Sequence, residues 1–195
     1  MKRTTFALTA LIAFTFGAAT ISAQNMLPSI TGASATTNAD AAKQWTPHTW
    51  TGSGELKLVD TADAKALQIA STEGGDLSWT TTVAVEPNCT YRIAAAIKTE
   101  DVKPSTGRGA LLNVHGMSGA QTKFVIGTTD WTPVEMIVRS GSNTQMQVNC
   151  LFGGWGLATG TALYKDLTME KIDLSNFVPQ VSIDASPESI EANPS

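Results

Sequence analysis

The sequence is poor in the side chains that most hydrolytic and transfer enzymes use. Histidine occurs only at His48 and His115, and no Gly-x-Ser-x-Gly segment is present to hold a nucleophilic serine at a strand-to-helix turn. Acids in the strand-like segments face bases or amides, so no pair of carboxylates is set for glycoside cleavage. The segment "GGWG" leads into a strand pattern and not into a helix, unlike a phosphate-binding loop. These absences predict a protein that is not an enzyme.

Basic residues are few and scattered. The chain has 13 Lys and Arg against 17 Asp and Glu, which gives a formal net charge of −4. Lys2 and Arg3 belong to the leader described below, so the exported chain is more acidic still. A nucleic-acid surface needs clustered basic side chains to neutralise phosphates. We therefore expect no nucleic-acid partner.

Cysteine is also scarce, with only Cys89 and Cys150. Neither has a second cysteine close by, which argues against zinc and haem-attachment motifs. In an oxidising compartment the two can form a disulfide. They can equally be separate buried thiols that pack as small hydrophobic side chains. The sequence leaves both alternatives open.

The N-terminus carries the one long apolar run. The basic start "MKR", the run "TTFALTALIAFTFGAA" and the small residues of "TISA" form the pattern of a secretory signal peptide. A membrane anchor is the alternative, but the run is shorter than the ~20 residues that a spanning helix needs. We therefore expect a signal peptide at 1–23, a secreted or periplasmic protein, and no membrane contact after cleavage.

Behind the leader, a β-rich region lies between two polar flanks. Residues 24–44 have no sustained period and predict a flexible lead-in. Residues 174–195 contain three prolines and predict a linker or tail. Residues 45–173 hold nine strand-like segments and no long helical period. They predict one all-β domain, a two-sheet antiparallel β-sandwich.

Alternation within the segments predicts which side chains lie between the two sheets. Apolar residues recur at every second position, while the intervening positions carry charges and amides. The predicted interior contains Tyr91, Ile93, Ala95, Ile97, Val134, Met136, Val138, Met146, Val148, Cys150 and Phe152. In "GALLNVHGM", Asn113 and His115 share the polar face.

Four segments occur in a characteristic order. They are "WTPHTWTGSGELKLVD", "ALQIAS", "EPNCTYRIAAAIKTE" and "TALYKDLTME". A tryptophan-containing opening, a leucine-rich strand pair, a turn ending in Thr-Tyr and a closing strand with an acid resemble the jelly-roll carbohydrate-binding modules of the CenC-like group. The resemblance covers about residues 45–173. It implies a galactose-binding-like jelly roll and a polysaccharide or oligosaccharide as partner.

Three further segments indicate where such a domain occurs within a larger protein. "GALLNVHGM", "GTTDWTPVE" and "NCLFGGWGLATGTALYKDL" are similar to domains that precede larger secreted bacterial enzymes, such as glycoside hydrolases and haem-containing dehydrogenases. This implies a non-catalytic accessory domain of an exported bacterial protein, with a downstream catalytic domain as a further partner. A structural or protein-binding accessory domain is the alternative.

The same resemblance implies a candidate metal site. The closing strand of such modules often has two neighbouring acids, one of which ligates a structural calcium, whereas Lys165 precedes Asp166 here. Asp166 would need further oxygen ligands, with the carboxylate of Glu55 and carbonyls near Gly54 as candidates. The alternative is that Asp166 is an ordinary outward-facing strand residue. No other cofactor is indicated.

Sugar-binding sites combine flat apolar rings, which stack on the pyranose, with amides that bond the hydroxyls. The glycines around Trp155 either leave its ring uncovered or admit it to a crowded corner. The neutral polar side chains of the strands supply the second component, unless they are ordinary surface residues. The predicted carbohydrate-binding residues are Trp155, Asn113, His115, Asn149 and Gln147.

The other tryptophans have separate interpretations. Trp45 and Trp50 can reach a site at the loop end of the sandwich. Trp79 alternates with apolar residues and is predicted to be core, and Trp131 is expected to cover an edge of the sandwich.

Overall fold

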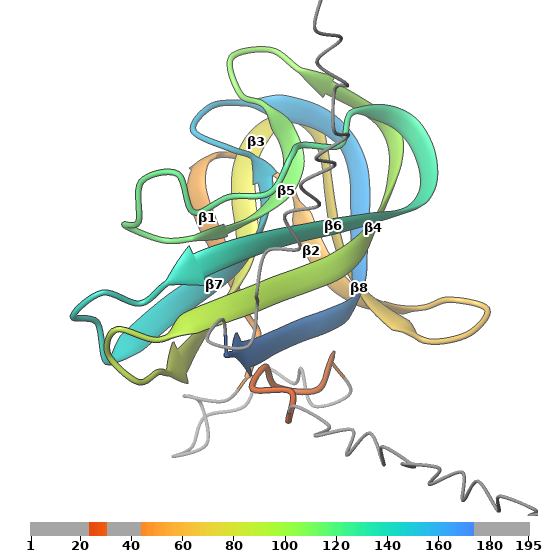
Figure 1. Cartoon of the computed structure of the whole chain (residues 1–195). Helices are drawn as coiled ribbons and strands as arrows, with labels where there is room; N and C mark the ends of the chain where they lie inside the picture. The colour runs from red at the N-terminus through yellow and green to blue at the C-terminus, as the bar shows by residue number, and fades with distance from the viewer. Residues whose placement is uncertain (1–23, 31–43, 174–195) are drawn as a thin grey trace, which may run out of the picture.

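The computed structural model describes residues 24–30 and 44–173 (Figure 1). The expected signal peptide at 1–23 and tail at 174–195 lie outside these residues, as does the 31–43 part of the lead-in. The strands of the described residues are β1 (Thr46–Gly52), β2 (Glu55–Asp60), β3 (Lys65–Ala84), β4 (Thr90–Pro104), β5 (Gly109–Val114), β6 (Gly127–Arg139), β7 (Gln145–Gly153) and β8 (Ala158–Ile172).

Strand β3 is long enough to belong to both sheets of the sandwich. Its first part, residues 65–71, pairs with β2 and β8, and residues 77–84 pair with β7. The register shifts between Ser71 and Gly75, and Gly74 there has a φ of 110°, which glycine adopts without strain. The chain therefore crosses from one sheet to the other at this point.

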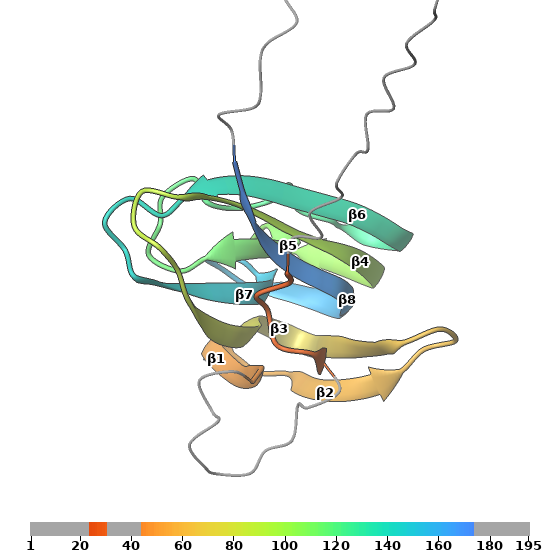
Figure 2. The ribbon, with the colours of Figure 1, turned by 60° about the horizontal axis from the view of Figure 1, so that its bottom comes forward.

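Two sheets result, and all their pairings are antiparallel. The β5 sheet has the order β5-β7-β3-β1, and the β6 sheet has the order β6-β4-β8-β3-β2. In Figure 2, β6, β4, β8 and β3 follow one another, and β1 and β2 both lie beneath β3. The predicted all-β, two-sheet antiparallel jelly-roll sandwich is confirmed.

The space between the sheets is filled by the side chains that alternation assigns to it. All eleven residues of the predicted interior are buried. Trp79 is buried as predicted, and its Nε1 donates to the carbonyl of Gln68 at 3.0 Å. Tyr91 is also structural, since its hydroxyl accepts the backbone N–H of Glu86 at 2.8 Å. The polar groups of these two aromatic side chains thus have hydrogen-bond partners inside the fold.

The start of the lead-in differs from the expectation. Residues 24–30 pack against the sandwich, with the N–H of Met26 donating to a carbonyl of β8 at 2.9 Å. Leu27 is buried, and so is Trp45, whose Nε1 donates to the carbonyl of Pro28 at 3.2 Å. The prediction of a flexible lead-in is wrong for these residues, because their apolar side chains extend the core. Trp45 is therefore not part of a loop-end site.

The two cysteines are free thiols in the structure. Cys150 is buried in β7, and Cys89 lies in the turn before β4. Burial raises the pKa of the Cys150 thiol well above its ordinary value, because a thiolate would lose its hydration there. Of the two alternatives, the structure has separate thiols, with Cys150 packing as a small hydrophobic side chain.

Within residues 24–30 and 44–173, no helix has the length and apolar character that crossing a membrane requires.

Candidate carbohydrate-binding site

A row of neutral polar side chains runs across the outer face of the β5 sheet. In antiparallel sheets, directly opposed residues place their side chains on the same face. Asn113 of β5 is opposite Asn149 of β7, which is opposite Thr80 of β3. The row continues to Thr46 of β1 and, on the other side of β5, to Gln121. Five uncharged hydrogen-bonding side chains are thus aligned.

Two amides of this row and a neighbouring amide of β7 form a connected network. Gln147 donates through Nε2 to Oδ1 of Asn149 at 3.1 Å, and Asn149 donates through Nδ2 to Oδ1 of Asn113 at 3.0 Å. Asn113 and Asn149 are only 5% and 1% exposed. The polar face that the sequence predicts is therefore not open to solvent at these two amides. They lie on the predicted face but beneath other side chains.

Part of that cover is a stack of rings. The indole of Trp50 lies parallel to the imidazole of His115, with ring centroids 5.0 Å apart and an angle of 11° between planes. Trp50 Nε1 donates to Oγ of Ser78 on β3 at 3.0 Å, and the ring centroid of His48 lies 4.0 Å from that of the indole. His115 follows β5, and β7 lies between β5 and β3. The stack therefore crosses β7, over the neighbourhood of Asn149.

Trp155 lies beside this row and is held outward. Its side chain is 57% exposed, and its backbone has a φ of 60°, a left-handed conformation that is unusual for a bulky residue. A Cβ on the preceding Gly153 would lie 2.4 Å from the carbonyl oxygen of Gly75. A Cβ on Gly156 would lie 2.5 Å from the backbone of Thr106. The glycines thus permit close backbone packing on both sides of an exposed ring.

Hydrogen bonds fix the loop that carries Trp155. The N–H of Gly156 donates to Oδ2 of Asp76 at 3.1 Å, and the N–H of Leu157 donates to Oγ1 of Thr106 at 2.9 Å. Asp76 is buried, and this desolvation raises the pKa of its carboxyl despite the opposing effect of loop N–H groups, including that of Gly154. The loop is therefore preorganised around a buried carboxyl group.

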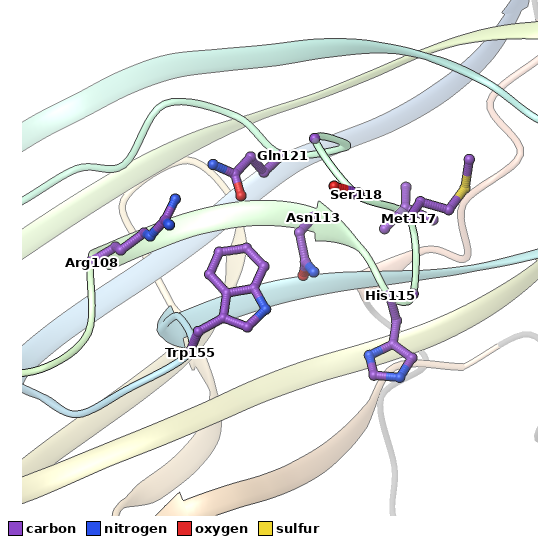
Figure 3. A pocket seen from close by; sticks show the side chains of 10 residues that line it. Arg108, Asn113, His115, Met117, Ser118, Gln121 and Trp155 are labelled. Atoms are coloured by element: carbon purple, nitrogen blue, oxygen red, sulfur yellow. The ribbon is translucent and has the colours of Figure 1, made fainter.

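A cleft of about 600 Å³ opens between Trp155, β5 and the segment after β5. Figure 3 shows the indole of Trp155 beside Asn113, with Arg108 at one end of the cleft and His115 at the other. Gln121 projects from the opposite side. The guanidinium carbon of Arg108 lies 5.2 Å from the centroid of the Trp155 ring.

The structure brings together part of the predicted set. Trp155, Asn113 and His115 line one cleft, while Asn149 and Gln147 lie behind Asn113 and orient it through the amide network.

Arg108 and Gln121 also line the cleft, but they were not predicted as site residues from the sequence. Arg108 immediately precedes a strand, where a charged residue is unremarkable. Gln121 joins the row only through a bridge to Asn113, a pairing for which it carries no local signal.

The residues expected for calcium do not fit such a site. Glu55 of β2 is aligned across β3 with Thr161 of β8, roughly 16 Å along the strand from Asp166 at 3.3 Å per residue. The carboxylate of Glu55 instead pairs with Lys57 at 2.6 Å. Among the described residues, no group of three or more His, Cys, Asp or Glu is arranged to hold a metal ion.

Lys165 already places a positive charge next to Asp166. Its ammonium group pairs with Asp63 at 2.5 Å and lies 4.5 Å from the centroid of the Trp131 ring. Trp131 is half-buried at this contact. A second cation beside this buried ammonium would be repelled.

Comparisons with known proteins do not assign a family. The sequence matches no protein-family model, and no curated protein matches it. Membership of the CenC-like group therefore stays a prediction.

Among solved structures, the chain is similar to the CBM22-1 xylan-binding domain from Paenibacillus barcinonensis Xyn10C, at 12% identity and a TM-score of 0.49, over 77% of this chain and 96% of that one. It is similar to TmCBM61 in complex with β-1,4-galactotriose, at 17% identity and a TM-score of 0.46, over 76% and 99%. It is also similar to the enzymatically active domain of bacteriophage CBA120 tailspike protein 4, at 11% identity and a TM-score of 0.49. That match covers 69% of this chain but spans only 21% of the tailspike domain.

Proposed function

We propose that this chain is a non-catalytic carbohydrate-binding module of an exported bacterial protein, and that glycan binds in the cleft beside Trp155. One observation carries the proposal: a bulky ring is held in a left-handed backbone conformation, 57% exposed, at the edge of a buried amide network. Residues held in sparsely populated backbone conformations cluster at active sites and ligand-binding sites.

The groups that surround the cleft suit sugar hydroxyls. The exposed indole face of Trp155 offers a stacking surface for the C–H side of a pyranose. Oδ1 of Asn113 is already bonded to Asn149, and no described residue accepts a hydrogen bond from its Nδ2. Neutral amides exchange bonds with water for bonds with hydroxyls at little desolvation cost. The amide of Asn113, oriented from behind, is the proposed polar contact.

The ring stack supplies the other end of the site. His115 lines the cleft and is supported by Trp50, whose indole nitrogen is fixed on Ser78. A sugar chain that runs from Trp155 past Asn113 therefore meets a second preorganised ring. Rigid partners reduce the entropy lost on binding.

The test is a glycan array with the exported chain, followed by titration of the strongest hit. Trp155→Ala should lose at least about fivefold in affinity, as expected for an aromatic at a binding hot spot. The fold should survive because the ring is largely exposed. The control is Ile137→Ala, which removes a 62% exposed apolar side chain from the β6 sheet and should leave affinity unchanged.

Three results would contradict the proposal. Unfolding of Trp155→Ala would make the ring a core residue, and an equal loss in both variants would remove the site from this face. Silence across plant, algal and microbial glycans would favour the alternative, a structural or protein-binding accessory domain.

Export is a separate part of the proposal. The leader pattern predicts a mature secreted or periplasmic protein that begins near Gln24. Amino-terminal sequencing of the exported protein tests this, and an intact Met1 on exported protein would contradict it.

A further inference from the structure

We infer that the glycan bound in this cleft is anionic, and that Arg108 recognises its carboxylate or sulfate groups. The inference rests on the proposed function and narrows its ligand class. Arg108 carries a positive charge, and stacking on Trp155 and hydrogen bonding to Asn113 do not need one.

Arg108 differs from most cations of the described residues. Seven lysine and arginine side chains there form ion pairs with Asp or Glu. Arg108 is in none of these pairs, and none of the described residues accepts a hydrogen bond from its guanidinium. Its main chain is fixed next to the Trp155 loop, because its backbone N–H donates to the carbonyl of Gly153 at 2.5 Å.

Two aromatic rings hold the guanidinium in place of a carboxylate. Its carbon lies 5.2 Å from the centroid of Trp155 and 6.0 Å from that of Phe124, which is 47% exposed. Aromatic contacts of this kind engage the flat face of the group and leave its in-plane N–H donors available. These donors match the two oxygens of a carboxylate, or of a sulfate, as a fork. Arg108 is thus positioned and unpaired.

The cleft contains no acidic side chain that could neutralise the charge of Arg108. None of the residues that line it is Asp or Glu. Asp76 lies beneath the Trp155 loop and is directed to the backbone N–H of Gly156. The chain as a whole carries a formal net charge of −4, so a cationic cleft does not follow from a generally basic surface. The local charge therefore favours an anionic ligand.

The expected effect is a preference between matched ligands. Charge-assisted hydrogen bonds are roughly twice as strong as neutral ones, so we expect about tenfold tighter binding of the acidic form. Arg108 is exposed, and the Debye length falls from about 10 Å at 0.1 M salt to about 3 Å at 1 M. The preference should therefore weaken as salt is added.

The experiment titrates the full exported chain with two pairs of polysaccharides. The first pair is polygalacturonate and its carboxyl-reduced form, and the second is carrageenan and its desulfated form. Each pair keeps the sugar backbone and removes the charge, so the two arms separate a carboxylate from a sulfate. Tighter binding of the acidic member of either pair supports the inference.

Variants assign the effect to the residue. Arg108→Gln should abolish the preference and the salt dependence while binding of the neutral member persists. Arg108→Lys should keep part of the preference, because the charge remains but the planar fork is lost. Arg92→Gln removes the same charge from the outer face of the β6 sheet and should change neither. Thermal unfolding should show all three variants folded, since both arginines are exposed.

The outcomes separate this inference from the proposed function. Equal binding of charged and neutral members, lost in Trp155→Ala, would overturn the anionic ligand and leave a carbohydrate-binding module. A preference that persists in Arg108→Gln would overturn the role of Arg108. Binding of no member of either pair, together with a silent glycan array, would overturn both proposals.

Discussion

The two outer faces of this sandwich differ in the charge and the solvent exposure of their polar side chains. On the β6 sheet, Arg92 pairs with Glu135 at 2.6 Å and Lys98 with Asp130 at 3.2 Å, and these side chains remain substantially exposed. On the β5 sheet, neutral amides are buried beneath rings and loops. The β6 sheet thus presents exposed ion pairs, whereas the β5 sheet buries neutral amides and has Arg108 and Trp155 exposed at its cleft.

This difference identifies the face that is arranged for contact. Exposed ion pairs contribute little to stability and keep a surface hydrated. Amides removed from water must be hydrogen-bonded, so their positions are fixed by their neighbours. The network of Gln147, Asn149 and Asn113 is such a fixed arrangement, and it ends at a cleft with an exposed tryptophan. A fixed amide network and a solvent-accessible ring thus occur together on the β5 side.

The largest predicted effect comes from the layer that both faces share. Phe152 of β7 is fully buried between the sheets, and Phe152→Ala should lower the free energy of unfolding by ~3 to 5 kcal/mol. Phe124→Ala removes an exposed ring of the same type and should change it by less than about 0.5 kcal/mol. Urea denaturation measures both. Similar losses would show that Phe152 does not anchor the core.

A smaller effect separates the two faces. Asn149→Ala removes the partner of both Asn113 and Gln147 and should lower the free energy of unfolding by ~1 to 3 kcal/mol. Arg92→Ala breaks an exposed ion pair on the other face and should lower it by ~0 to 1 kcal/mol. If Arg92→Ala were the more damaging change, the contrast between the faces would be wrong.

The smallest expected effect is a pH dependence beneath the site. Burial raises the pKa of Asp76 above its ordinary value of 3.8, so the folded protein binds the proton more tightly than the unfolded chain does. The stability contribution of this group is therefore fully present below pH 3.8 and decreases as pH rises through the folded-state pKa.

Comparison with Asp76→Asn isolates this contribution, because the other titrating groups are common to both proteins. Chemical denaturation between pH 3 and pH 7 should show wild-type stability falling relative to the variant as pH rises. A relative gain by the wild type would mean that the loop N–H groups outweigh desolvation.

Sequence periodicity predicted the inner layer well because alternation depends on local chemistry. Every second residue of β7 from Met146 to Phe152 is apolar. This alternation alone is enough to predict which face of the strand is buried. The same alternation placed Asn113 and Asn149 on the outer face. Their burial could not be predicted, because it depends on long-range contacts such as the pairing of β1 with β3, which brings Trp50 onto this face.

The remaining site residues were hidden for a related reason. Arg108 becomes a candidate binding residue because its guanidinium contacts the rings of Trp155 and Phe124, which come from other segments of the chain. The lead-in was misjudged because "QNMLPSI" has no strand period, yet its apolar side chains pack beside β8. Tertiary contacts of this kind leave no local pattern.

The most direct test of the central claim is a two-dimensional ¹H–¹⁵N NMR titration of the labelled exported chain with the strongest ligand from the glycan array. We predict perturbed indole N–H signals for Trp155 and Trp50 and perturbed side-chain amide signals for Asn113, with the backbone signals of Arg92 and Ile137 unmoved. Shifts confined to the outer face of β4 and β6, with both indole signals unchanged, would contradict the assignment of the binding site to the β5 sheet.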